Sequence, residues 1–179
     1  MSTEVKRLLA IDPAPTKSGI VGLQIERCQH GAAPKVLFAA IVDNLTWQFI
    51  TVPQRKWWND YQLSRFFEYD HLAIEMVRNY GKIAGDSLFE TAKWVGCFEQ
   101  AWRPRPFTEL YRPAIKLALC QTARCGDPQV RSAIIDRYPK TGGGKTPAVG
   151  TKKQPGPLYG IHDDLWAALA VGIAWCEQE

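Results

Sequence analysis

The feature that most constrains this chain is an apolar run that ends in a single carboxylate. Residues 7–11 are Arg, Leu, Leu, Ala and Ile, Asp12 follows them, and a turn rich in Pro, Ser and Gly begins at Pro13. Such a run predicts a buried β-strand. An ionised Asp left without a partner in the interior is costly. We therefore expect Asp12 to stand at the end of its strand, beside a loop, and to face a cleft.

Two other acidic positions lie far along the chain in similar contexts. Glu75 interrupts an otherwise apolar strand predicted over 71–77, and Asp163 and Asp164 open a helix predicted over 163–177. The predicted order of strands and helices brings all these acids to one edge of a sheet. The sequence therefore predicts a cleft lined by carboxylates.

Each acidic position also has an ordinary structural explanation. Asp12 before a proline is typical of a turn, and Glu75 could form an ion pair with the nearby Arg78. Asp163 and Asp164 could cap the last helix and complement its dipole. These alternatives remain open at the level of the sequence.

The rest of the chain predicts a mixed α/β domain. The third to fifth strands and the helices alternate, and a helix that crosses over between two strands favours parallel pairing. The further strands are expected at 19–25, 36–42, 71–77 and 107–111, and the helices at 54–68, 86–102, 113–120, 127–138 and 163–177.

Size and composition fit one soluble domain spanning residues 1–179. The hydrophobic fraction is 46%, which is enough for a buried core, and the formal net charge of +4 excludes a histone-like polycation. Five cysteines lack any zinc-binding spacing and are expected to be free thiols. The chain shows no secretory pattern and no long apolar run. We expect a cytoplasmic location and no membrane partner.

A compositional break covers residues 139–157. It contains three consecutive glycines and several prolines and lysines, and it predicts a flexible basic loop rather than a domain boundary. Lys145, Lys152 and Lys153 could bind a DNA backbone there, although a merely soluble linker would look the same. The Gly-Lys-Thr triplet at 144–146 is not a P-loop, because Pro139 stands where the leading glycine belongs.

The carboxylates of Asp12, Glu75, Asp163 and Asp164 are the ligands that a site for two metal ions requires. Mg²⁺ prefers hard oxygen ligands, and two ions about 4 Å apart can hold the attacking water and the leaving oxygen of a phosphodiester. A nuclease is the function that this chemistry predicts.

Four stretches together resemble one known family. They are residues 10–19, residues 74–77, the segment 113–116 together with Gln129 and Val130, and residues 162–171. In this order and across nearly the whole chain, they resemble the RuvC family of Holliday junction resolvases, especially the versions carried by phages.

The resemblance implies an RNase H-like fold, which is a mixed five-stranded sheet with three antiparallel strands and then parallel strands, flanked by helices. It implies that Asp12, Glu75 and Asp164 bind Mg²⁺, with Mn²⁺ able to substitute, and that Lys116 assists at the scissile phosphate, although Lys116 could also be a solvated helical lysine. It also implies a homodimer acting on four-way DNA junctions, in the host cytoplasm if a phage encodes the chain. The tryptophans of helix 86–102, Trp94 and Trp102, exceed what one helix face must bury and favour such a dimer.

The chain departs from the family pattern at three places. Ala167 stands where the family carries a second acid, so Asp163 could substitute and either member of the pair could be the ligand. Asp127 stands where a second lysine is usual. The aromatic residue that opens the junction has no equivalent, and Arg78, Tyr80 and Lys82 are the nearest candidates for DNA contacts.

Two other functions remain open. The chain could be a different RNase H-like nuclease, such as a terminase-type or flap-cutting enzyme. It could also be a non-catalytic DNA-binding module, an alternative that Ala167 favours.

Overall fold

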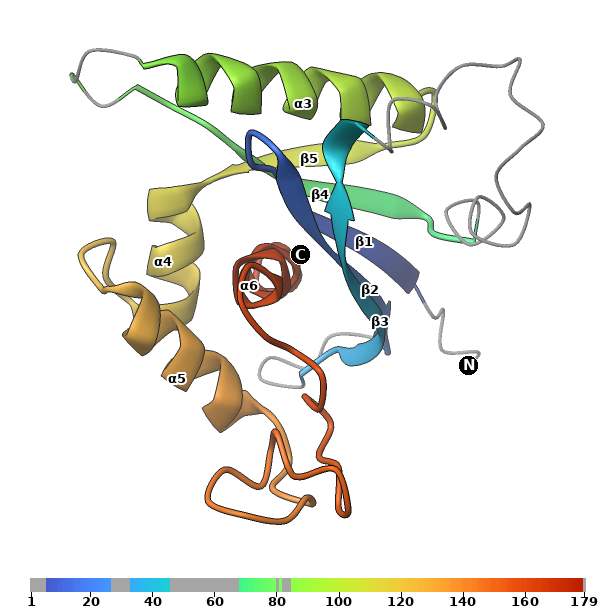
Figure 1. Ribbon diagram of the computed structural model, residues 1–179, viewed down its shortest axis with the longest axis vertical. Coiled ribbons are helices and arrows are strands. Elements are labelled where there is room, and N and C mark those ends of the chain that lie inside the picture. Colours follow the sequence, from blue (N-terminus) through green and yellow to red (C-terminus); the bar gives the residue numbers. More distant parts are fainter. Residues whose placement is uncertain (1–5, 27–32, 46–67, 80, 82–84, 179) are drawn as a thin grey trace.

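The computed structural model describes residues 6–26, 33–45, 68–79, 81 and 85–178 (Figure 1). Its centre is a five-stranded sheet in the order β3-β2-β1-β4-β5. β1 pairs antiparallel with β2, and β2 with β3, whereas β1 and β4, and then β4 and β5, run parallel. The predicted mixed topology is therefore confirmed. The strands are β1 (Lys6–Asp12), β2 (Lys17–Ile25), β3 (Lys35–Asp43), β4 (His71–Met76) and β5 (Phe107–Tyr111).

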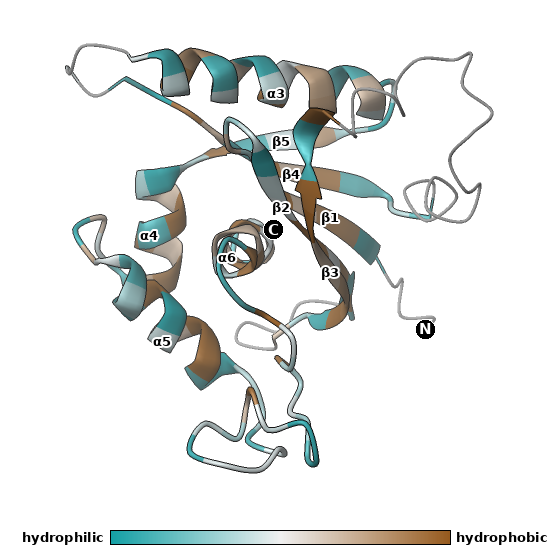
Figure 2. Ribbon diagram, viewed as in Figure 1, coloured by the Kyte–Doolittle hydropathy of each residue, from teal (hydrophilic) through white to brown (hydrophobic). Residues whose placement is uncertain are grey.

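The central strand β1 supplies side chains to two separate cores. Leu8 and Ala10 belong to the core on one face of the sheet, and Leu9 and Ile11 belong to the core on the other face. Because successive side chains of a strand point to opposite faces, a strand that is covered on both sides must be apolar throughout. This is why the run before Asp12 shows no polar alternation, and Figure 2 shows the middle of β1 in brown.

Helix α3 (Asp86–Trp102) covers one face of the sheet (Figure 1). Trp94 and Trp102 are both buried there, against Leu9, Ile11 and their neighbours. The sequence argument that these tryptophans exceed the needs of one helix face is therefore wrong, because the chain's own core contains both. They give no support to a dimer.

Helices α4 (Arg112–Cys120), α5 (Asp127–Arg137) and α6 (Leu165–Cys176) lie on the opposite face. Figure 1 shows α6 nearly end-on between the sheet and the outer pair α4 and α5. Residues Leu165 and Trp166, and all those from Ala168 to Trp175, are buried. The sequence predicted one apolar face, whereas α6 is buried almost all round because it has protein on both sides.

Smaller predictions have mixed outcomes. The helix expected over 54–68 lies outside the described residues, as does Cys28. Cys97, Cys120, Cys125 and Cys176 form no disulfide with one another. Helix α5 is preceded by Gly126 as its N-cap, and Asp127 is its first residue. No helix among the described residues is both long and apolar enough to cross a membrane.

The segment expected to be a flexible basic loop has a compact, hydrogen-bonded form between α5 and α6. Gly142 N donates to Pro147 O at 2.8 Å and Gly156 N donates to Val149 O at 3.0 Å. Ala148 and Leu158 are fully buried in the core around α6. How mobile this loop is in solution stays a prediction, but its conformation has internal support.

Candidate active site

Three parallel strand ends form the edge of the sheet that carries the candidate site. Asp12 is the last residue of β1, Glu75 is next to last in β4, and Arg112 directly follows β5. The register pairs Ile11 with Ile74 and Glu75 with Leu110. Parallel strands bring their carboxyl ends to one edge, so the register places Asp12 beside Glu75 and Arg112 close by.

Asp12 and Glu75 form a close carboxyl pair. Burial, and next the negative charge of Glu75, raise the pKa of Asp12 well above its ordinary value, and Asp164 raises it further. The pKa of Glu75 is also raised, mainly by burial, although Arg112 and a hydrogen bond from Asp12 oppose the rise. Two carboxylates cannot both be ionised at such a site without a compensating cation or a shared proton.

Arg112 is the nearest such cation, and the sequence analysis missed it. Its Nη1 donates to Glu75 Oε2 at 3.0 Å and its Nη2 donates to Asp127 Oδ1 at 3.0 Å. The sequence left open an ion pair of Glu75 with Arg78, whereas the structure pairs Glu75 with Arg112. A signal existed in the sequence, because the residue after a strand parallel to 71–77 must emerge at the same edge as Glu75.

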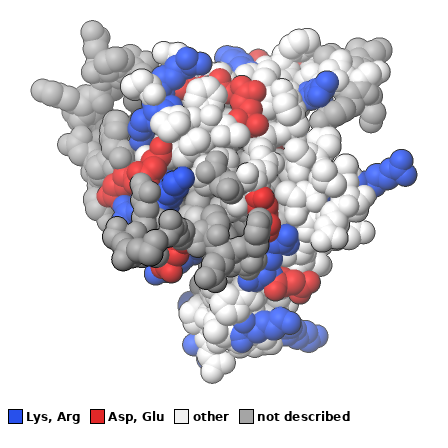
Figure 3. Space-filling view, turned by 180° about the vertical axis from the view of Figure 1, so that it is seen from behind, with Lys and Arg blue, Asp and Glu red and all other residues white. Residues whose placement is uncertain are grey.

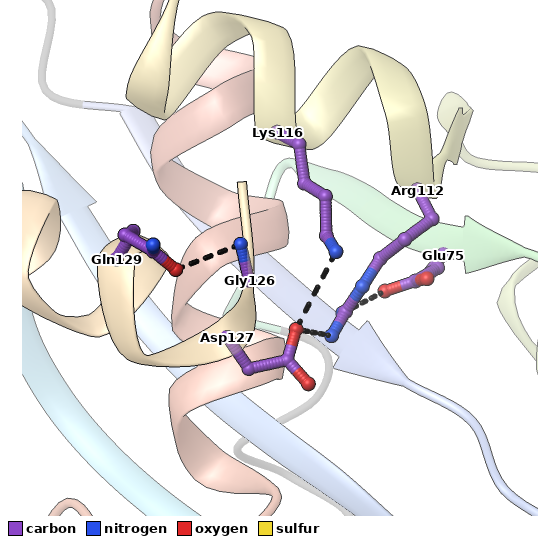
Figure 4. Close-up of polar contacts among 6 residues, drawn as sticks. All are labelled: Glu75, Arg112, Lys116, Gly126, Asp127 and Gln129. Carbon is purple, nitrogen blue, oxygen red and sulfur yellow. Dashed lines mark hydrogen bonds and ion pairs between the residues drawn. The ribbon is translucent and has the colours of Figure 1, made fainter. Parts of the chain in front are cut away.

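Lys116 points toward the same group of charges. Its Nζ lies 3.7 Å from Asp127 Oδ1, and its side chain is only 19% exposed. Figure 4 shows Arg112 and Lys116 extending from α4 toward Asp127, with Glu75 beside the guanidinium of Arg112. Lys116 is thus a partly buried cation next to the site and not a solvated helical lysine. Asp127, the departure from the family pattern, orients both cations.

The structure distinguishes between the two adjacent acids before α6. Asp164 acts electrostatically on Asp12, and its backbone O would lie 2.7 Å from a Cβ added at Gly19, the residue paired with Asp12 across β1 and β2. Only glycine allows this close approach. Asp163 Oδ2 instead accepts a hydrogen bond from His162 Nδ1 at 2.9 Å, and the Asp163 side chain is 78% exposed. Asp164 makes no side-chain capping bond, so capping does not explain it.

A buried polar network holds the turn that follows Asp12. Ser18 Oγ donates to Asn44 Oδ1 at 2.7 Å, and Asn44 Nδ2 donates to Ala14 O at 2.6 Å. Trp94 Nε1 donates to Pro15 O at 3.0 Å, which ties the turn to α3. Asn44 directly follows β3, and no local pattern in the sequence pointed to it.

The predicted DNA contacts lie on separate segments of the chain. Arg78 is exposed, with its guanidinium carbon 5.6 Å from the centroid of the Tyr111 ring. Lys145, Lys152 and Lys153 lie exposed on the loop before α6. Tyr80 and Lys82 lie outside the described residues.

The residues present fit a divalent cation in part. Asp12 and Glu75 supply hard oxygen donors, and burial is the main cause of their raised pKa values, so a bound cation would stabilise their ionised forms. Asp164 lies near enough to raise the pKa of Asp12. Within the described ranges, however, no group of three or more His, Cys, Asp or Glu side chains is assembled closely enough to hold a metal ion. The structure brings Asp12 and Glu75 together and leaves Asp164 at the margin of the site.

The strand order and flanking helices define an RNase H-like α/β fold with an acidic edge. No protein-family model matches the chain, and neither does any curated protein. Among solved structures, the chain is similar to Thermus thermophilus RuvC, with 17% identity and a TM-score of 0.56 over 96% of this chain and 93% of that one.

The chain is also similar to T. thermophilus RuvC in complex with a Holliday junction substrate, with 17% identity and a TM-score of 0.54 over 94% of this chain and 92% of that one. The fold is therefore that of RuvC, as the sequence resemblance predicted.

Proposed function

We propose that this chain is a Mg²⁺-dependent endonuclease that hydrolyses phosphodiester bonds in branched DNA and resolves four-way junctions by paired nicks. The observation that carries the proposal is the buried pair of Asp12 and Glu75 at the ends of adjacent parallel strands. The likeness to RuvC, which has been solved with a Holliday junction substrate, supports the choice of branched DNA.

In this proposal Asp12 and Glu75 would be the principal metal ligands, and Asp164 would be the third. Bound Mg²⁺ would supply a polarised water and offset the charge of the phosphodiester, and Mn²⁺ would substitute for it. Lys116 and Arg112 offset negative charge that develops at the scissile phosphate. Arg78, Tyr80 and Lys82 are proposed to contact DNA. Paired nicks require two such sites, and the working form is accordingly a homodimer.

The proposal is tested by cleavage of a labelled four-way junction in Mg²⁺, with flap and linear duplex substrates of equal length alongside. Asp12→Asn and Glu75→Gln should bind the junction as tightly as the unaltered chain and lose its cleavage. Lys93→Gln, an exposed change on α3, is the control and should cut normally. Normal cleavage by both acid variants would overturn the proposal, and preferred cutting of flaps or linear duplex would point to a different RNase H-like nuclease.

A second candidate function has a specific observation in its favour. Arg112 already neutralises Glu75, and Asp164 stands at the margin of the site. Both features would be expected of a non-catalytic module that binds branched DNA. Such a module would bind junctions with a preference over linear duplex and would cut no substrate in Mg²⁺ or Mn²⁺.

A further inference from the structure

One segment, residues 139–161, contains basic residues and no acidic ones, and is called here the basic loop. The chain has 22 basic and 18 acidic residues. The basic loop holds four of the basic residues and none of the acidic ones, so the remaining chain has 18 of each. The four are Lys140, Lys145, Lys152 and Lys153. The whole formal net charge therefore equals the charge of this loop.

The lysines of the basic loop are available to a partner. All four are exposed, and none of them forms an ion pair with a residue in the part of the chain that the structure describes. Figure 3 shows blue side chains gathered on the lowermost part of the molecule, where Figure 1 places the loop. An unpaired cluster of one sign creates a local positive potential that attracts an anionic surface.

Backbone hydrogen bonds give the basic loop a defined shape. Gly143 N donates to Gln154 O at 2.9 Å, and Thr151 N donates to the same oxygen at 2.9 Å. Leu158 N donates to Ala148 O at 2.9 Å. These bonds join residues up to eleven positions apart, so they close the loop on itself rather than forming a series of independent turns.

Three glycines pack together inside the basic loop. A Cβ added at Gly142 would lie 2.6 Å from Gly156 N and 2.7 Å from the Cα of Gly150. Gly150 also has a positive φ of 78°, a conformation that other residues rarely adopt. The two ends and the middle of the loop therefore meet at a point where no side chain fits.

The basic loop is anchored to the core and leads directly to the candidate site. Ala148, Leu158 and Ile161 are buried among the side chains around α6. Asp163 and Asp164 follow within three residues of Ile161. The lysines are thus held by a supported backbone whose far end delivers Asp164 to the edge that carries Asp12.

We propose that the basic loop is a preformed docking surface for the phosphate backbone of one duplex arm of the DNA. The proposal rests on the proposed DNA function and adds that binding by the loop is separate from the chemical step. A merely soluble linker would have no need of buried anchors or a glycine-packed centre. Holding the lysines on a supported backbone lowers the entropy lost when they bind phosphates.

The test uses the full chain and measures DNA affinity by fluorescence anisotropy at several salt concentrations, in EDTA so that the DNA is not cut. Lys152→Gln with Lys153→Gln should reduce the slope of log affinity against log salt by about 1.8 and weaken binding roughly 10- to 60-fold at 0.1 M salt. Junction and linear duplex should weaken equally, because phosphate contacts carry no sequence or branch information. The charge-matched control is Lys35→Gln with Lys93→Gln, both exposed and distant in sequence.

A glycine variant separates shape from charge. Gly150→Ala keeps all four lysines and disrupts the packed centre, so it should weaken binding toward the level of the lysine variant. The control is Gly96→Ala in α3, where an added Cβ would meet no atom within 4 Å, and it should bind normally.

The results of these experiments distinguish failure of this inference from failure of the proposed function. An unchanged salt slope in the Lys152 and Lys153 variant, with junction cleavage intact in the unaltered chain, overturns the inference alone. Normal binding by folded Gly150→Ala overturns the claim that the surface is preformed, and if that variant fails to fold the lysine variant still decides. Absence of any DNA binding or cleavage by the unaltered chain overturns both.

Discussion

Arg112 holds Glu75 through a 3.0 Å contact between its Nη1 and Oε2, and the same guanidinium reaches Asp127. Glu75 is only 13% exposed, so this is a partly buried ion pair. Negative charge from Glu75, Asp12 and Asp127 raises the pKa of Arg112 against the opposing effect of burial. The guanidinium therefore supplies the positive charge that the carboxyl pair requires in the absence of a metal ion.

Replacing Arg112 should show that the carboxyl pair depends on this positive charge. We expect Arg112→Gln to lower the free energy of unfolding in EDTA by about 1–3 kcal/mol, because it leaves Glu75 buried without its cation. Mg²⁺ should restore part of the loss, so it should stabilise the variant more than the unaltered chain. Urea unfolding with EDTA or Mg²⁺ measures both. Arg124→Gln on an exposed turn is the control, and equal losses with and without Mg²⁺ would contradict the prediction.

The carboxyl pair should make stability in EDTA depend on pH. The raised pKa of Asp12 means that the folded chain binds this proton more tightly than the unfolded chain does. The contribution of the pair to stability is therefore greatest below the ordinary carboxyl range and declines as pH rises through the raised pKa.

Asp12→Asn removes that titration and should be more stable than the unaltered chain at pH 8 by roughly 1–3 kcal/mol. The difference should shrink toward zero at pH 4. Chemical unfolding at the two pH values in EDTA tests it. An equal difference at both values would mean that Asp12 does not titrate as the structure indicates.

The two acids before α6 should behave differently. Asp164→Asn should reduce junction cleavage by more than the roughly 10- to 100-fold typical of outer metal-site partners. Asp163→Asn, which loses only an exposed contact with His162, should cut within a few-fold of the unaltered chain. Single-turnover cleavage rates compare them directly, and the reverse ranking would identify Asp163 as the ligand.

Gly19 should be needed for the position of Asp164. A Cβ at residue 19 would press on the backbone carbonyl of Asp164, and neither backbone can move freely at this point. We expect Gly19→Ala to destabilise the fold by about 1–3 kcal/mol and to slow cleavage. Thermal unfolding and cleavage assays together measure the effect. Gly96→Ala serves again as the matched control, and a neutral result at Gly19 would mean that α6 approaches less closely.

Asn44 should support the turn after Asp12. Asn44→Ala leaves Ser18 and the Ala14 carbonyl without their buried partner, at a cost of about 1–3 kcal/mol. Ser18→Ala should cost less once Asn44 is already replaced, because the two side chains belong to one network. A double-mutant cycle by urea unfolding tests this, and additive losses would show that the two act independently.

Local patterns in the sequence were sufficient for the sheet. The unbroken apolar run of β1 reflects burial on both faces, and the helix patterns between the later strands predicted their parallel pairing. The fold follows from these patterns because they depend on the spacing of neighbouring side chains. The same patterns placed Asp12 and Glu75 at strand ends, and hence at one edge.

What the sequence determined by itself is therefore the mixed sheet and the identity of the acids at its edge. Only the tertiary structure decided that Arg112 and not Arg78 pairs with Glu75, that Asp164 rather than Asp163 approaches Asp12, and that the tryptophans of α3 are internal. These outcomes depend on contacts between residues far apart in the chain, where a guanidinium or a missing Cβ matters only because another element lies against it. Spacing along the chain does not encode such contacts, since they are set by how helices and strands pack in space.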